Sequence, residues 1–130
     1  MISNISSGSL HFNMSFGAVL DRIMRQVEYH CFADLHNGLI DPIFKELCLI
    51  ISEIFFIDPD AVIKVNGSLT PVRLVQDVFT QLRNEHIRLV FSNFQDVTYR
   101  VYNKKAYLRT ALYNSVFEIE SYFINSAFLD

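Results

Sequence analysis

Residues 103–114 carry the side chains with the clearest potential for chemistry, and that chemistry is recognition. On a helix, Lys105, Arg109 and Tyr113 would follow one another at steps of four and share one side, with Tyr102 nearby. Cations beside aromatic rings suit single-stranded nucleic acid, whose bases stack on rings and whose phosphates meet lysine or arginine. They suit an acidic protein surface equally well. The pattern alone favours a third interpretation, in which the basic side merely keeps an amphipathic helix soluble.

Positive charge is concentrated in the same region. The chain of 130 residues has a net charge of −3, which argues against non-specific coating of duplex DNA, because that affinity comes from neutralised phosphates. Between residues 83 and 109, however, six basic residues stand against two acidic ones, a local charge of +4. We therefore expect one basic face on an acidic body. The candidate residues for binding nucleic acid or a protein partner are Arg100, Tyr102, Lys104, Lys105, Arg109 and Tyr113.

Other reactive side chains give little reason to expect catalysis. The histidines are scattered, and His30 and His36 with Asp34 between them lack the spacing of a helical zinc site. The glycines are isolated, so the sequence has no phosphate-binding loop, and it has no GxSxG turn. The two aspartates around Pro59 are explained better by a helix stop than by a catalytic carboxylate pair. We expect a non-catalytic domain without metal or cofactor.

The composition is typical of a cytoplasmic protein. No apolar run reaches the roughly 18–20 residues that cross a bilayer, and the N-terminus lacks the basic start and apolar stretch of a signal peptide. Cys31 and Cys48 are isolated in the sequence. Without an export signal, we expect both to be buried free thiols rather than a disulfide. We therefore predict a cytoplasmic location and no membrane contact.

The recognition side chains need a framework, and the apolar periodicity predicts a helical one. The helix that begins at Asp41-Pro42 is strongly apolar and is predicted to be central, with Asp as N-cap and Pro at the first helical position. Residues 1–14, which include several Ser and a Gly, are predicted to be a flexible leader of native or cloning origin. The predicted helices cover residues 15–32, 42–57, 71–82, 84–95, 103–114 and 117–128, with a linker over 96–101.

One short segment departs from the helical pattern. Val62, Ile63 and Val65 are β-branched, and Asn66-Gly67 is the strongest two-residue signal for a hairpin, because both turn positions need positive φ. The fold class is therefore predicted to be mainly α, a compact bundle of about six helices with one short β-hairpin. We expect a single helical domain over residues 15–130.

Several runs of residues form one pattern in their order and spacing. The most specific run is Tyr107 to Asn114, preceded by Asn103 and Lys105. The others are Arg25-Gln26-Val27-Glu28-Tyr29, then Ile63-Lys64-Val65-Asn66-Gly67 with Pro71, then Phe79, Leu82, His86 and Ile87, and finally Ile119, Ser121, Tyr122 and Phe123. Together, over roughly residues 22–128, these runs resemble the C-terminal domain of RepA_N-type replication initiators of Firmicute plasmids and integrative elements.

The resemblance implies a domain similar to the helical domains of the primosome protein DnaD. Such a domain would bind host replication proteins and, secondarily, single-stranded DNA, and it could form a homo-oligomer. Lys104 and Arg109 depart from the family, which usually has apolar residues at both positions, so this helix is more basic than in its relatives. The N-terminal domain with which the family recognises its origin has no counterpart in this sequence, so origin recognition is not implied.

That missing domain leaves two kinds of protein open. The chain is either an excised C-terminal domain of an initiator or a free-standing relative. In the second case, the alternative function is that of a mobile-element protein that binds and inhibits a host nucleoprotein complex, such as a CRISPR nuclease. The small size and the acidic body favour this alternative.

Overall fold

The described part of the chain folds into five helices, a 3-10 turn and one hairpin. The computed structural model describes residues 14–97 and 101–129, with the backbone alone at residue 123 and residues 125–129. The helices are α1 (Phe16–Gln26), α2 (Pro42–Ile54), α3 (Val72–Phe79), α4 (Asn84–Gln95) and α5 (Lys104–Leu129), with a 3-10 turn, η2 (Tyr29–Phe32). Strands β1 (Val62–Val65) and β2 (Ser68–Pro71) pair antiparallel. The predicted class, mainly α with one short hairpin, is confirmed.

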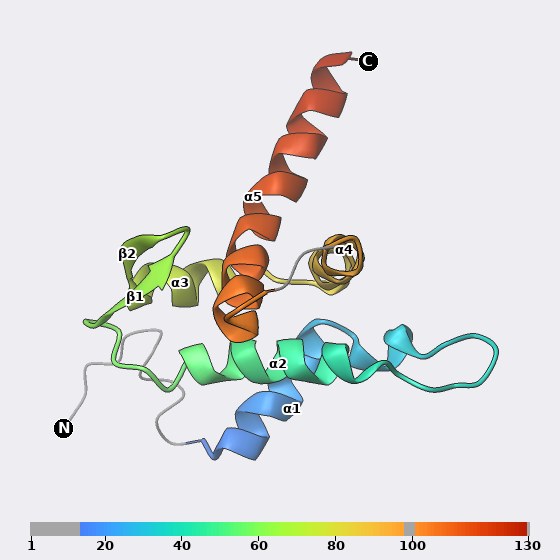
Figure 1. Cartoon of the computed structure of the whole chain (residues 1–130), viewed down its shortest axis with the longest axis horizontal. Coiled ribbons are helices and arrows are strands. Elements are labelled where there is room, and N and C mark those ends of the chain that lie inside the picture. The colour runs from blue at the N-terminus through green and yellow to red at the C-terminus, as the bar shows by residue number, and fades with distance from the viewer. Residues whose placement is uncertain (1–13, 98–100, 130) are drawn as a thin grey trace.

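The helices are arranged around α2. Helix α1 packs on one side of α2, while α3, α4 and α5 lie on the other (Figure 1). Asp41 caps α2, because its Oδ1 accepts a hydrogen bond of 2.9 Å from the backbone N–H of Ile43, and Pro42 fills the first helical position. Eight of the 13 residues of α2 are buried. Helix α2 is therefore the central helix that the sequence predicts.

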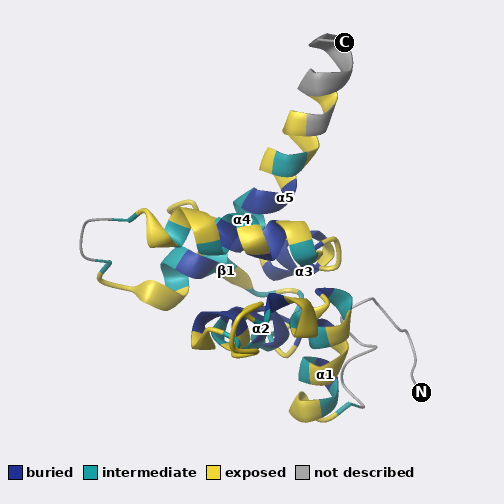
Figure 2. Cartoon of the chain, turned by 90° about the vertical axis from the view of Figure 1, so that its right-hand side faces the viewer, coloured by how far each residue is buried: buried dark blue, intermediate teal, exposed yellow. Residues whose placement is uncertain are grey.

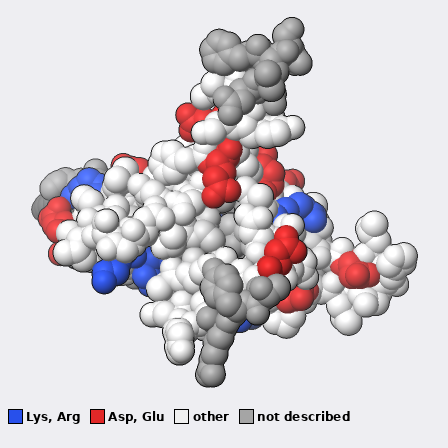
Figure 3. All heavy atoms as spheres, turned by 45° about the horizontal axis from the view of Figure 1, so that its top comes forward, with Lys and Arg blue, Asp and Glu red and all other residues white. Residues whose placement is uncertain are grey.

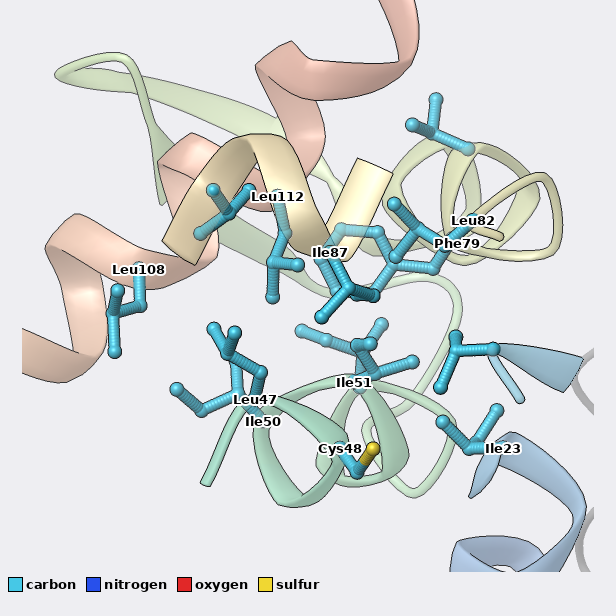
Figure 4. Close-up of a cluster of buried hydrophobic side chains, with 14 of the residues drawn as sticks. Ile23, Leu47, Cys48, Ile50, Ile51, Phe79, Leu82, Ile87, Leu108 and Leu112 are labelled. Atoms are coloured by element: carbon cyan, nitrogen blue, oxygen red, sulfur yellow. The ribbon is translucent and has the colours of Figure 1, made fainter. Parts of the chain in front are cut away.

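The core is formed by aliphatic and aromatic side chains from all five helices (Figure 4). Helix α1 contributes Ile23, α3 contributes Phe79 and α4 contributes Ile87, each at most 2% exposed. Leu108 and Leu112 of α5 are fully buried against them. Burying one such side chain stabilises the fold by roughly 1.5–3 kcal/mol. The first half of α5 is thus fixed to the body by its apolar side.

The hairpin has the register that its turn residues predict. Val65 pairs with Ser68, and Asn66 and Gly67 form the turn between them. Their φ angles are +55° and +74°, the left-handed region that asparagine and glycine adopt most easily. The two-residue turn predicted from Asn-Gly is confirmed.

Helix α1 is shorter than the periodicity predicts. It ends at Gln26 rather than at Phe32, because Glu28 adopts φ +56° and the chain continues as η2. The carbonyl of Val27 accepts a hydrogen bond of 3.0 Å from the side chain of Asn84, so it is not used to continue the helix. The side-chain amide of Gln26 donates to the carbonyls at the end of α3 and just beyond it. The prediction of a helix to residue 32 was wrong because contacts distant in sequence end α1 earlier.

Helix α5 is longer than predicted. The helices expected over residues 103–114 and 117–128 form one continuous helix of 26 residues. The residues between them, Ser115 and Val116, are both buried, and the hydroxyl of Ser115 donates a hydrogen bond of 2.7 Å to the carbonyl of Leu112. Because this polar group is satisfied within the helix, the helix continues. The predicted break in this region was therefore wrong.

The structure changes the predictions for the two cysteines and for the N-terminal leader at one residue each. Cys48 is buried, as expected, but Cys31 is exposed, so the prediction of two buried thiols is wrong for Cys31. Residues 1–13 of the predicted leader and residues 98–100 of the predicted linker lie outside the described residues. Met14, the last leader residue, packs partly buried against the core. Among the described residues, no helix is both long and apolar enough to span a membrane.

Candidate functional site

Helix α5 positions most of the candidate binding residues. Asn103 precedes its first turn, and its side-chain oxygen accepts a hydrogen bond of 3.0 Å from the backbone N–H of Ala106. Tyr107 and Ala111 pack half-buried against the core beside the buried Leu108 and Leu112. The side predicted to face inward is thus confirmed. The remaining positions of α5 point toward α2, the hairpin or solvent.

The two lysines of the candidate surface contact acidic residues of α2. The Nζ of Lys104 lies 2.9 Å from a carboxylate oxygen of Glu46, and the Nζ of Lys105 lies 2.7 Å from one of Glu53. Lys104 also lies over the ring of Phe94, 5.7 Å from its centroid. These ion pairs join the start of α5 to α2, and they neutralise much of the charge that the sequence suggests is available. About half of each lysine side chain stays exposed, so each pair stabilises the fold by at most about 1 kcal/mol.

The other candidate residues have different surroundings. Arg109 is half-buried, and its Nε has no hydrogen-bond partner among the described residues. Tyr113 packs against Phe117, with their ring centroids 5.3 Å apart. Tyr102 is 94% exposed and precedes the helix. Arg100 lies outside the described residues. The candidate residues that the structure describes therefore differ in their surroundings, and two of them are paired with α2.

Two parts of the chain that are distant in sequence, the hairpin turn and the middle of α5, contact each other. The side-chain amides of Asn66 and Asn114 exchange two hydrogen bonds, of 2.9 and 3.0 Å. The backbone N–H of Asn66 also donates to the hydroxyl of Thr110 at 3.3 Å. Thr110 and Asn114 are four residues apart on α5 and so lie on one side of it. These three residues, which we call the asparagine latch, hold the hairpin turn against α5.

A cavity of about 450 Å³ lies beside the asparagine latch, between α4, α5 and the hairpin. Its apolar lining comes from residues such as Leu89, Val90 and Ala111. Lys64 and Glu118 are its charged lining residues. This volume lies in the range of small-ligand sites and also of a pocket for one or two side chains of a partner. The cavity marks the place where α5 leaves the body.

Beyond this point, the outer part of α5 projects from the fold (Figure 1). Burial gives way to exposure along the helix after Val116 (Figure 2). Phe117 is 46% exposed, Tyr122 66% and Ile124 50%. Exposed apolar side chains gathered on one projecting element are a common sign of a protein-binding surface. We call residues 117–124 the projecting segment.

The titratable groups with clearly shifted pKa belong to other elements. Burial raises the pKa of the Cys48 thiol to about 12, so this thiol stays protonated and unreactive. Burial, and secondarily Cys48, raises the pKa of Tyr29. Burial lowers the pKa of His86. Asp34, which the sequence places between two histidines, accepts hydrogen bonds from the backbone N–H groups of His36 and Asn37 and so stabilises a turn.

Sequence reasoning missed both the asparagine latch and the projecting segment. The spacing of Thr110 and Asn114, four residues apart on one helix, is a signal for a polar contact on one side. It does not identify Asn66 as the partner, which is 44 residues from Thr110. The projecting segment could have been inferred from the lack of any Gly or Pro after Asn103.

Comparison with known protein families gives a match over almost the whole chain. Residues 15–130 match the model of a protein family described as "Family of unknown function (DUF6017)". The match covers every element from α1 to α5, and with them the asparagine latch and the projecting segment. No curated protein and no solved structure matches the chain.

Proposed function

Because the chain belongs to the DUF6017 family, whose function is unknown, we propose its function from its own surface: a non-catalytic domain that binds a host replication protein. In this proposal it acts as the C-terminal domain of RepA_N-type replication initiators does, by coupling a mobile element to the host machinery. The projecting segment carries the proposal, since it places Phe117 and Ile124 half in solvent on a helix that extends away from the body.

The resemblance to the initiators supports the choice of a replication partner. Its two most informative runs, around Asn66 and from Tyr107 to Asn114, contain the residues of the asparagine latch. When two matching runs contact each other in the fold, their joint match is a stronger sign of similarity than two matching runs that do not interact. The latch therefore supports a relation in fold, and through it the proposed role.

The charges favour a protein partner over single-stranded DNA. Lys104 and Lys105 are both paired with glutamates of α2, and the whole chain has a net charge of −3. Single-strand binding usually needs a continuous basic groove with several stacking rings. Arg109 is the remaining candidate cation in the described part of α5, and one arginine is a weak basis for phosphate binding.

The proposal is tested by capture of the partner from a Firmicute lysate with the tagged full chain as bait. We expect mass spectrometry to identify a primase, a replicative helicase or a helicase loader. Purified candidate and chain should then form a complex on size exclusion. A bait of similar size and charge but unrelated sequence is the control. Enrichment of no replication protein over this control would contradict the proposal.

A further inference from the structure

The projecting segment has an unusual combination of apolar and acidic side chains. Between Thr110 and Leu129 the sequence has two charged residues, and both are acidic: Glu118 and Glu120. Both are exposed, and neither forms an ion pair within the described residues. Figure 3 shows acidic atoms at the root of the projecting helix. Lys64 lines the same cavity as Glu118, but no ion pair joins them.

The side chains of the projecting segment fall on defined sides of the helix. Phe117, Glu120 and Ile124 follow one another at steps of three and four and so form one stripe. Glu118 and Tyr122 form a second stripe, which begins at the cavity. Each stripe therefore offers apolar contact area next to a carboxylate. A helix packing along either stripe would meet the same pattern.

We propose that the projecting segment docks an amphipathic helix of the partner, whose apolar stripe is flanked by lysine or arginine. This inference rests on the proposed function and specifies the chemistry of the partner. The apolar residues of that helix cover Phe117 and Ile124, and its cations pair with Glu118 and Glu120. The net charge of −3 adds long-range attraction for a basic partner.

The same charges argue against the other occupants of this surface. A second copy of the chain would bring acidic stripes together, and like charges facing each other are unfavourable. Nucleic acid and an anionic membrane carry negative charge, which Glu118 and Glu120 repel. A basic amphipathic helix satisfies both the apolar and the acidic side chains, and it uses a common mode of peptide recognition.

The test uses a fluorescent amphipathic peptide of about 18 residues, made of leucine and lysine, as the probe. Binding to the full chain is measured by fluorescence anisotropy. A peptide of the same pattern with glutamate in place of lysine is the matched control. We expect the lysine peptide to bind, with an affinity that falls as salt is added, and the glutamate peptide not to bind. Equal binding of both peptides would overturn the inference.

A pair of charge reversals locates the binding. The double variant Glu118→Lys/Glu120→Lys should weaken binding of the lysine peptide by about tenfold or more. The control, Asp21→Lys/Asp77→Lys, makes the same change of net charge at exposed positions of α1 and α3, and it should leave the affinity within about twofold. Equal weakening by both double variants would mean that the peptide senses only net charge, which would overturn the proposed site.

A pair of apolar substitutions tests the contact surface. Phe117→Gln/Ile124→Gln should also weaken binding by about tenfold, because two exposed apolar contacts are lost while the helix is kept. Leu35→Gln/Leu39→Gln removes two leucines that are even more exposed, in a loop away from α5, and should have no effect. Circular dichroism checks that each variant stays helical. Unchanged binding by the first variant would overturn the inference.

Light scattering on a size-exclusion column tests whether the chain instead forms a dimer through this surface. A dimer that Phe117→Gln/Ile124→Gln dissociates would assign the surface to a second copy and overturn the inference.

The proposed function and the docking inference can fail independently of each other. If a replication protein is captured equally by wild type and by this variant, that function holds and the projecting segment is not its site. If the lysine peptide binds as described but no replication protein is captured, the surface holds and the proposed function fails.

Discussion

At the scale of single residues, His86 caps the start of its own helix, α4, by a hydrogen bond that depends on its protonation. Its Nδ1 accepts a hydrogen bond of 2.9 Å from the backbone N–H of Arg83, just before α4 begins. Only the neutral imidazole can accept this bond through Nδ1. Burial is the main reason that the pKa of His86 is lowered; the charge of Glu85 opposes this shift and the charge of Arg83 adds to it. The neutral ring is therefore part of the folded structure.

This arrangement predicts a loss of stability in mild acid. The pKa of His86 is lower in the folded state than the value of 6.5 expected when it is unfolded, so the unfolded chain takes up the proton first. The contribution of His86 is fully present above about pH 6.5 and is lost as the pH falls through the folded pKa. Urea denaturation of the wild type and of His86→Gln across this range measures the effect.

The glutamine variant should show a shallower decrease of the unfolding free energy with falling pH than the wild type does. His36→Asn, on an exposed turn, is the matched control and should keep the wild-type slope. If His86→Gln and the wild type lose stability in parallel between about pH 7.5 and 5.5, His86 is not the group responsible.

At the scale of elements, the asparagine latch connects the hairpin to α5. The turn brings Asn66 to α5 because two consecutive residues adopt positive φ. The latch fixes the hairpin beside the cavity, and the ion pairs of Lys104 and Lys105 fix the start of the same helix to α2. Helix α5 is thus attached at several places along its first half, which provides a rigid base for the projecting segment.

The latch predicts a specific loss of stability. Asn114→Ala removes both side-chain hydrogen bonds to Asn66 and should lower the unfolding free energy by about 0.5–1.5 kcal/mol, measured by urea denaturation. Asn93→Ala is the matched control, since Asn93 is helical and lines the same cavity but forms no side-chain hydrogen bond among the described residues. Helix propensity rises equally in both variants. Equal stability of the two variants would show that the latch contributes nothing.

At the scale of the whole molecule, the distribution of charge matters more than its total. The positive charge predicted for residues 83–109 is partly paired with acidic residues of α2, which are distant in sequence. The projecting segment carries the opposite sign without such pairing in the described chain. The described part of the molecule therefore has an acidic and apolar extension, and the two lysines of the predicted basic face are paired with glutamates of α2.

The charge distribution predicts weak binding of nucleic acid. A fluorescent oligothymidine should not bind the chain at about 0.15 M salt, because at most one cation of the candidate surface in α5 is available to phosphate. Any binding at low salt should be reduced by Arg109→Gln but not by Arg22→Gln, an exposed arginine of α1. Anisotropy at two salt concentrations measures this. Tight binding that Tyr113→Ala weakens would contradict the prediction and favour the single-strand hypothesis.

The sequence by itself determined the local features of this protein. The Asp41-Pro42 helix start, the Asn66-Gly67 turn and the inward side of α5 at Leu108 and Leu112 all follow from backbone preferences and apolar periodicity within a few residues. Such features depend on neighbours in the chain, so they can be predicted from one sequence. The mainly helical class follows from them.

Only the tertiary structure decided where helices end and which side chains remain available. Val27 gives its carbonyl to Asn84, Lys105 pairs with Glu53, and Asn114 meets Asn66, each across more than 45 residues of sequence. Each of these contacts replaces a hydrogen bond that the same group would otherwise form within its helix or with water. The free energy of such a contact depends on how the helices and the hairpin pack. For this reason the basic first half of α5, which the sequence indicates as a binding surface, mainly attaches the helix to α2 and the hairpin. The projecting segment of the same helix, which is apolar and acidic, is the candidate site.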